Sequence, residues 1–464
     1  MEKRNSFKGS LGFVLAAAGS AVGLGNIWRF PYLAAKDGGG LFLFVYIVLA
    51  LTFGFALLTT EVAIGRKTKQ SPLTAYGVVH PKWKSLGILG CLVPMIIMPY
   101  YSAIGGWVIK YFTVYLTGEG VAAAEDGYFG GFITSTASPI IYMVIFLGIC
   151  AYFIIRGVND GIEKMSRIIM PALVVLVMII SIFALTIKFQ DGDSIRTGLQ
   201  GLKIYVVPDF TGITISGFLS VALDAMGQLF YSLSVAMGIM IAYGSYVSDE
   251  SNLVKSINQI EIFDTLIAFL AGVMTIPAVY VFMGREGMSA SGPSLMFVSL
   301  PKVFVAMGPI GNFIGILFFA MVLFAAITSA VSILEAVVSS IMDQFKVTRT
   351  KATVIEGIIA LVVGVVVCLG YNVFYFEKTL PNGAVAQVLD ILDYISNNIL
   401  MPVAAICTCI LIGWIVKPEY IIGECVKNGE KFGREKLYKV MIRFVAPILL
   451  FILLIKAVGL MPNL

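Results

Sequence analysis

Long apolar stretches alternate with short polar loops along the whole chain. Stretches of about 20 apolar residues, the length that crosses a lipid bilayer as a helix, occupy residues 11–35, 41–65, 87–116, 138–155, 167–187, 216–247, 259–284, 309–340, 352–373, 388–416 and 439–460. The pattern therefore predicts eleven membrane-spanning helices within one transmembrane domain over residues 1–464.

The first span is interrupted by polar and helix-loosening residues. Between Gly19 and Pro31 it contains Gly23, Asn26 and Arg29. An arginine near mid-membrane costs roughly 3 kcal/mol on insertion scales unless it meets a partner or a water-filled cavity. A packing helix with small residues four apart would explain the glycines, but not the asparagine and the arginine. We therefore expect a broken helix whose free carbonyl and amide groups bind an ion and a polar ligand.

The sixth span is the second interrupted one. Residues 227–238 gather small and hydroxyl residues at its centre, five spans after the first break. Interrupted spans in corresponding positions of two halves are the best sequence pointer to a transport site. Residues 1–190 and 216–416 are thus expected to form two inverted repeats of five spans, with residues 439–460 as an added eleventh span.

Composition and charge fit this membrane class and exclude others. The chain is 59% hydrophobic and 13% charged, which a soluble protein of 464 residues could not accommodate. The net charge of +5 is no sign of nucleic-acid binding, because most Lys and Arg residues fall in short loops on one side of the membrane. This bias places the N-terminus in the cytoplasm. An odd number of spans then places the C-terminus outside the cell membrane; the sequence leaves the oligomeric state open.

The reactive side chains argue against an enzyme. The six cysteines form no CxxC pair and are interpreted as core thiols, and His80, the single histidine, lies in a loop. No phosphate-binding loop is present, so neither ATP nor an organic cofactor is expected. A sodium-conducting channel would need a polar stripe along several spans, whereas polar groups here converge at one depth. A receptor-like amino-acid sensor on the same fold remains an alternative.

Several motifs resemble the neurotransmitter:sodium symporter family, of which the bacterial leucine transporter is the structural type. In chain order they are residues 19–31, Gly38-Gly39-Gly40, Glu61, the Tyr100-Tyr101 pair, the hydroxyl cluster of span six, and residues 325–329. The resemblance runs from Arg4 to about the tenth span, and the family's twelfth span is missing. It implies an all-α leucine-transporter fold and sodium-driven import of a small molecule by alternating access.

The resemblance also implies two sodium sites made of carbonyl and hydroxyl oxygens, which suit a hard cation. The first would combine the Ala21 carbonyl, the Asn26 amide oxygen, Ser232 and Asp264 with the substrate carboxylate. The second would combine the carbonyls of Gly19, Val22 and Ala325 with the hydroxyls of Thr328 and Ser329. Alternatively, these two hydroxyls bond back to their own helix and ease a bend.

For the substrate, the resemblance implies an amino acid with an uncharged side chain. Its carboxylate would meet the amides of Leu24 and Gly25 and the hydroxyl of Tyr101, since amides at a half-helix N-terminus attract anions. Its amino group would meet carbonyls around Ala21, Tyr231 and Ser234. The side-chain pocket would contain Ile97, Tyr231, Met237, Ser329 and Ile333. Amine-transporting relatives carry an aspartate where this chain has Gly23, so we expect a neutral hydrophobic or aromatic L-amino acid.

Two gates are implied in the same way. Arg29 and Asp393 would form an outer ion pair over the site, with Gln228 beside it. On the inside, Arg4 and Asp343 would pair, supported by Tyr246. A static structural role is the alternative for such pairs, because a buried ion pair is weak evidence of a switch.

Asp264 suggests how the site balances its charge. Chloride-dependent relatives place an asparagine here, near groups that match Tyr46, Gln228 and Ser232; the fourth match, Ala268, lacks a hydroxyl. A fixed carboxylate would replace the chloride, so we expect chloride-independent transport. Without a cation, burial disfavours the charged carboxylate. We therefore expect Asp264 to return protonated and export a proton in each cycle. Alternatively, it is a sodium ligand that stays ionised.

Overall fold

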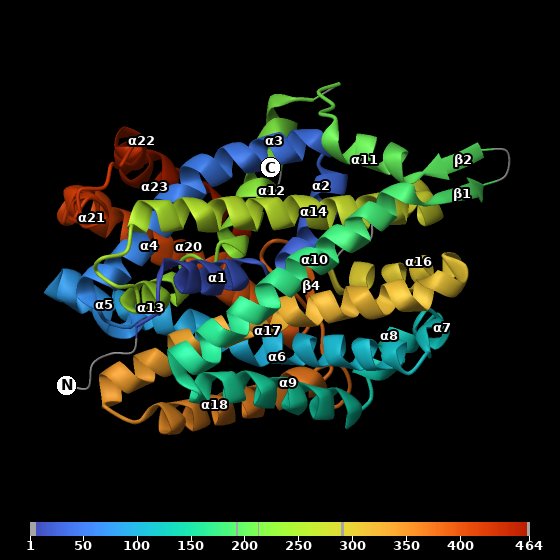
Figure 1. The fold of residues 1–464 in the computed structure, drawn as a ribbon, viewed down its shortest axis with the longest axis horizontal. Coiled ribbons are helices and arrows are strands. Elements are labelled where there is room, and N and C mark those ends of the chain that lie inside the picture. Colours follow the sequence, from blue (N-terminus) through green and yellow to red (C-terminus); the bar gives the residue numbers. More distant parts are fainter. Residues whose placement is uncertain (1–5, 192–193, 212, 289–291, 462–464) are drawn as a thin grey trace.

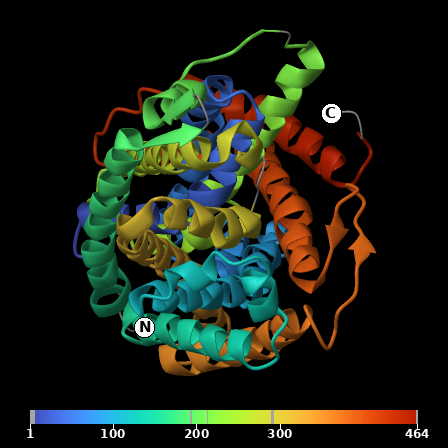
Figure 2. The ribbon, with the colours of Figure 1, turned by 90° about the vertical axis from the view of Figure 1, so that its right-hand side faces the viewer.

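The computed structural model describes residues 6–191, 194–211, 213–288 and 292–461. Long helices lie side by side, and two short hairpins of β-strands lie outside them, β1 with β2 in Figure 1 and the orange pair at the edge of Figure 2. In the end view of Figure 2 blue and yellow helices occupy the middle of the bundle. They are enclosed by the teal α10 on one side and by the red C-terminal helices on the other.

Every apolar range expected to span the membrane coincides with one helix or with a broken pair. Among the described residues, nine helices are long and apolar enough to cross a bilayer: Gly40–Thr68, Pro81–Leu116, Ser138–Ile155, Val158–Thr186, Leu253–Gly287, Gly308–Phe345, Arg349–Leu369, Val388–Ile415 and Glu435–Ala457. A tenth span is the pair Ser10–Ala21 and Gly25–Lys36, bent by 54°. The remaining expected span, 216–247, is divided between α12 (Ile215–Ser232) and α13 (Ile239–Ser245).

The other elements carry the labels of Figure 1. The helices of the spans are α1 (Ser10–Ala21), α2 (Phe30–Lys36), α3 (Gly40–Leu49), α4 (Phe55–Thr68), α6 (Leu86–Leu116), α9 (Ser138–Ile155), α10 (Lys164–Thr186), α14 (Leu253–Gly287), α17 (Gly311–Phe345), α18 (Arg349–Leu369), α19 (Val388–Asp393), α20 (Met401–Ile410) and α23 (Ala446–Ala457). Shorter elements are α5 (Pro72–Val79), α7 (Gly120–Ala123), α8 (Tyr128–Ile133), α11 (Gly198–Val206), α15 (Gly292–Ser294), α16 (Leu300–Ala306), α21 (Glu419–Cys425), α22 (Glu435–Val440), β1 (Lys188–Asp191), β2 (Ser194–Thr197), β3 (Lys378–Thr379) and β4 (Val385–Ala386).

The break in the first span lies in the middle of the helix bundle. α1 ends at Ala21, and a π-helical turn, Gly25–Arg29, leads into α2. α1 packs against α10, α14 and α17, so the break is surrounded by protein (Figure 1). Backbone groups released at membrane depth are tolerated only in such a setting or around a cavity.

The break in the sixth span contains unusual backbone. Between α12 and α13, Ser234 has φ 53° and Ala236 has φ 61°, a left-handed region that non-glycine residues rarely adopt. The carboxylate of Glu61 on α4 accepts the Ala236 amide at 2.6 Å, which holds this conformation in place. A strained backbone at a buried site is typical of binding sites.

Candidate binding site at the two helix breaks

One buried pocket lies between the two breaks. Every residue that the sequence analysis assigns to the substrate lines it: Ala21, Leu24, Gly25, Ile97, Tyr101, Tyr231, Ser232, Ser234, Met237, Ser329 and Ile333. Ser20, Gly23 and Asn26 complete the lining. The pocket therefore brings together residues of α1, α6, α12, α17 and the two breaks.

The pocket is nearly filled by its own side chains. Its free volume is about 20 Å³, which is room for about one water molecule. The buried Met237 and the partly buried Tyr231 both line this space. Met237 is unbranched and has several rotatable bonds. A ligand with a sizeable side chain thus needs this methionine or the tyrosine ring to move.

Gly23 leaves no room for a side chain. A Cβ atom at this position would lie 2.8 Å from the Ser329 hydroxyl oxygen and 3.5 Å from the Tyr101 hydroxyl oxygen. The Tyr101 hydroxyl group is buried and has no hydrogen-bond partner among the described residues. A free hydroxyl beside bare backbone can donate to a carboxylate that the ligand itself brings.

The proposed first ion site is centred on Asp264 of α14. Its fully buried carboxylate accepts hydrogen bonds from Asn26 Nδ2 at 2.9 Å, from the Ser232 hydroxyl at 2.7 Å and from the Tyr46 hydroxyl at 3.3 Å. The Ser232 hydroxyl also lies 3.2 Å from Asn26 Oδ1. The side-chain oxygens expected to bind sodium are thus close neighbours, and they come from three separate elements.

The proposed second ion site is centred on Ser329 of α17. Its hydroxyl lies 3.1 Å from the Ser20 carbonyl and 3.5 Å from each of the carbonyls of Gly19 and Val22. The Thr328 hydroxyl instead donates to the Phe324 and Ala325 carbonyls of its own helix, both at 3.1 Å. The back-bonded alternative thus describes Thr328 in this conformation, whereas Ser329 reaches across to the broken end of α1.

Sequence reasoning missed Ser20. Its carbonyl accepts hydrogen bonds from both Ser329 and Ser234, each at 3.1 Å, and its hydroxyl lies 3.1 Å from that of Ser234. The residue therefore joins the two breaks directly. Its position inside the glycine-rich motif, next to Gly19, is the signal that could have indicated it.

A second, wider cavity of about 450 Å³ lies on the other side of Tyr231. Arg29, Asp224, Asn397 and Lys456 are among the residues that line it. Tyr231 lines both cavities, so its ring separates the wide cavity from the small one. The wide cavity is therefore positioned as an entrance to the buried pocket.

Of the expected outer gate residues, Arg29 lines this entrance. No ion pair or hydrogen bond joins Arg29 to Asp393 among the described residues. Asp393 accepts a hydrogen bond from Asn397 Nδ2 at 2.6 Å, and Gln228 donates to the Gly25 carbonyl at 3.1 Å. The ion pair of Arg29 and Asp393 therefore stays a prediction. We expect it to form in another conformation of the protein. Asn397, four residues after Asp393, was missed by sequence reasoning.

The opposite end of the pocket is closed by a different set of contacts. Tyr246 donates to Glu335 at 2.5 Å, and Glu335 forms an ion pair with Arg349 at 2.5 Å. Asp343 accepts the Ser71 amide at 2.7 Å. Arg4, its expected partner, lies outside the described residues. Sequence reasoning missed the pair of Glu335 and Arg349, although a glutamate within the apolar α17 was a usable signal.

Comparison with known proteins identifies the family. A profile described as "Sodium:neurotransmitter symporter family" matches residues 4–122 and 132–463. The chain belongs to this family. An uncharacterised sodium-dependent transporter of Bacillus subtilis is 30% identical over 99% of both chains, and human sodium- and chloride-dependent GABA transporter 2 is 25% identical over 81% of this chain and 69% of its own length. The chain is thus a multi-pass membrane transporter and not an enzyme.

The fold is also that of a solved member. The crystal structure of MhsT in complex with L-phenylalanine superposes with a TM-score of 0.85 and 32% identity, and the match covers 98% of this chain and all of that one. This confirms the predicted all-helical fold class and the resemblance on which it rested.

Proposed function

We propose that this member of the symporter family couples sodium to the import of a neutral hydrophobic or aromatic L-amino acid. The observation that carries the proposal is the pocket between the two helix breaks, which no charged residue lines and into which the unpartnered Tyr101 hydroxyl faces. An ionic side chain would go unpaired there at a cost of a few kcal/mol. MhsT, bound to L-phenylalanine in its crystal, supports the substrate class.

Each end of the amino acid has a separate role in this proposal. The Tyr101 hydroxyl and the backbone at Leu24 and Gly25 would hold the carboxylate. Carbonyls near Ala21, Tyr231 and Ser234 would hold the amino group. Two sodium ions would occupy the oxygen clusters around Asp264 and Ser329. Because one ion would contact the substrate carboxylate, sodium and amino acid would stabilise each other's binding.

Alternating access would use the two closures described above. The wide cavity leads to Tyr231, whereas the side of Tyr246 and Glu335 is sealed. We assign the wide cavity to the outside and the sealed end to the cytoplasm, with the N-terminus inside and the C-terminus outside. Spans 1–5 and 6–10 would act as the inverted repeats that exchange these two states.

Sodium-dependent binding tests the proposal directly. Purified protein is expected to bind L-phenylalanine, L-tryptophan or L-leucine at least about tenfold more tightly in sodium than in potassium buffer, a coupling of about 1.4 kcal/mol. L-lysine and L-glutamate, which would bury an unpaired charge, serve as controls and should not bind. Equal affinity in both buffers would contradict sodium coupling.

The outer gate gives a second prediction. If Arg29 and Asp393 close over the bound substrate, Asp393→Asn should slow uptake about tenfold or more and leave equilibrium sodium binding nearly unchanged. Melting temperatures must be compared, because the change also replaces the charged acceptor of Asn397 with a neutral amide oxygen. Asp390→Asn, three residues away on α19, is the matched control. Uptake at the normal rate by Asp393→Asn would refute the gate.

A further inference from the structure

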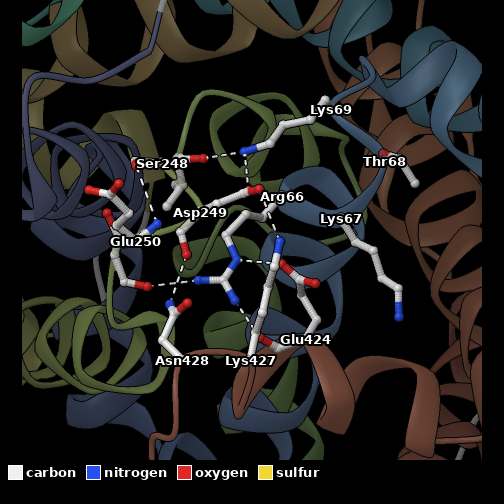
Figure 3. Close-up of polar contacts among 12 residues, drawn as sticks. Arg66, Lys67, Thr68, Lys69, Ser248, Asp249, Glu250, Glu424, Lys427 and Asn428 are labelled. Carbon is white, nitrogen blue, oxygen red and sulfur yellow. Dashed lines mark hydrogen bonds and ion pairs between the residues drawn. The ribbon is translucent and has the colours of Figure 1, made fainter.

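Arg66, at the end of α4, is fully buried and holds two segments that are distant in the sequence. Its Nε donates to Glu424 of α21 at 2.6 Å, and one Nη group donates to the carbonyl of the same residue. The other Nη group donates to the Ser251 carbonyl at 2.7 Å, in the loop between α13 and α14. Figure 3 shows the guanidinium group beside Glu424. Its planar fork serves three acceptors in a fixed geometry that the compact ammonium group of a lysine does not reproduce.

Asp249 ties the same segments together nearer the surface. Its carboxylate forms ion pairs with Lys69 at 2.9 Å and with Lys427 at 3.0 Å (Figure 3). The Asn428 side chain donates to the Asp249 carbonyl at 2.7 Å, and Lys69 donates to the Val247 carbonyl at 2.6 Å. The end of α4 and the loop 246–252 therefore contact α21 in the interior, through Arg66. They contact the segment after α21 at the surface, through Asp249.

α13, the helix that precedes loop 246–252, also packs closely against α4. A Cβ atom on Gly65 would lie 2.1 Å from the Ile241 carbonyl oxygen, and one on Gly244 would lie 2.4 Å from the Val62 carbonyl oxygen. The two backbones thus touch, which only glycine at these positions permits. At the other end of α13, Glu61 of α4 accepts the Ala236 amide. α13 is thereby attached to α4 along its whole length.

The segment before α1 meets this group mainly through Phe7, whose ring packs against Tyr243 of α13 and against Tyr246. The Phe7 amide donates to the Tyr246 carbonyl at 3.1 Å, and Tyr246 belongs to the closed inner end described above. α1 itself packs mainly on α10, α14 and α17. Loop 246–252 thus connects the contacts that close the inner end with the contacts made by Arg66 and Asp249.

We propose that Arg66, Lys69, Asp249, Glu424 and Lys427 form an inner clamp that makes α4, α13 and α21 one moving body. When the inner end opens, the clamp stays intact and α1 leaves. Arg66 and Asp249 are thus positioning residues for transport. The inference rests on the proposed function and deepens it. It assigns α21 to the part of the protein that moves as one body, and it fixes loop 246–252 against α4 and α21.

The clamp does not act as a pH switch in the physiological range. The hydrogen bond from Lys69 and the ion pairs lower the pKa of the Asp249 carboxyl below its ordinary value. The stabilisation that its charge provides is therefore present above the ordinary pKa of an aspartate and is lost only as the pH falls through the lowered one. Near neutral pH the Asp249 carboxylate is therefore charged in this structure.

Spin-label distances test the clamp in the full-length protein. One label pair joins Gly423→Cys on α21 to Lys255→Cys on α14; residue 423 has open space for a side chain. A second pair joins Leu11→Cys on α1, which is 60% exposed, to Lys255→Cys. Exchanging sodium for potassium should change the 11–255 distances and leave the 423–255 distances unchanged. A sodium-dependent 423–255 distance would overturn the proposal.

Two matched substitutions then distinguish an effect on the position of the helices from a general loss of stability. Asp249→Asn should broaden the 423–255 distances and raise the open fraction of the 11–255 pair at least about threefold at one sodium concentration. Glu250→Gln, its exposed neighbour, should behave as the unmodified protein. Arg66→Lys should act like Asp249→Asn. Identical distances in Asp249→Asn and Glu250→Gln would refute the clamp. These comparisons need no substrate, so a failure of sodium-dependent binding would refute the proposed function separately.

Discussion

Asp264→Asn is expected to lower sodium-driven uptake in chloride-free buffer by about 100-fold or more. Two sodium ions and a zwitterion would bring two positive charges to a fully buried site, where the Asp264 carboxylate is the acceptor for Asn26, Ser232 and Tyr46. Removing one member of a buried, charge-balanced group costs about 3 kcal/mol or more, which corresponds to about two orders of magnitude in affinity. Uptake at several chloride concentrations measures the effect.

The double variant distinguishes charge balance from damage to the site. Asp264→Asn with Ala268→Ser supplies both the neutral side chain and the missing hydroxyl, so chloride should restore uptake in the double variant and not in the single one. The benefit of an acidic vesicle interior, expected if Asp264 exports a proton, should disappear in both. Ala268→Ser alone is the control. Chloride dependence of the unmodified protein, with gluconate as a poor substitute, would show that the carboxylate does not play this role.

Ser329→Ala should weaken sodium binding about tenfold or more. The Ser329 hydroxyl faces the Ser20, Gly19 and Val22 carbonyls, and a ligand to a charged group contributes about 1.5–3 kcal/mol. The sodium concentration that gives half-maximal amino-acid binding measures the effect.

Neighbouring hydroxyls provide the controls for this site. Ser339→Ala removes a buried hydroxyl that bonds only to the Ala336 carbonyl of the same helix, so sodium binding should be unchanged. Thr328→Ala combined with Ser329→Ala should abolish sodium-stimulated binding, provided that Thr328 turns from its own helix toward the ion. If Ser329→Ala and Ser339→Ala need the same sodium concentration, the second site does not lie where we place it.

Much of the pocket was predictable because polar residues at membrane depth are costly and therefore informative. Asn26 and the glycines of the first span indicated the break, and Asp264 stood out as a carboxylate in an apolar span. The family motifs then assigned Tyr101, Ser232 and Met237 to one pocket, and the structure places them together.

The rest depended on contacts between segments that the sequence keeps apart. Arg66 and Glu424 are 358 positions apart, and each alone resembles an ordinary loop charge at a membrane surface. Ser20 makes these contacts mainly through its backbone carbonyl, which every residue possesses. Its side chain therefore did not indicate a role in the site. The ion pair predicted for Arg29 and Asp393 stays a prediction, because a contact that forms in only one conformation cannot be located from the sequence.

Uptake into proteoliposomes tests the central claim most directly. With sodium outside and potassium inside, the unmodified protein should accumulate L-phenylalanine about tenfold or more above its outer concentration, since a tenfold gradient of one coupled ion stores about 1.4 kcal/mol. Abolishing the sodium gradient, or introducing Asn26→Ala, should stop this accumulation. Sodium-dependent binding without accumulation would fit a sensor, and sodium flux without amino acid would fit a channel. Either result, or accumulation that is equal without sodium, would contradict sodium-coupled symport.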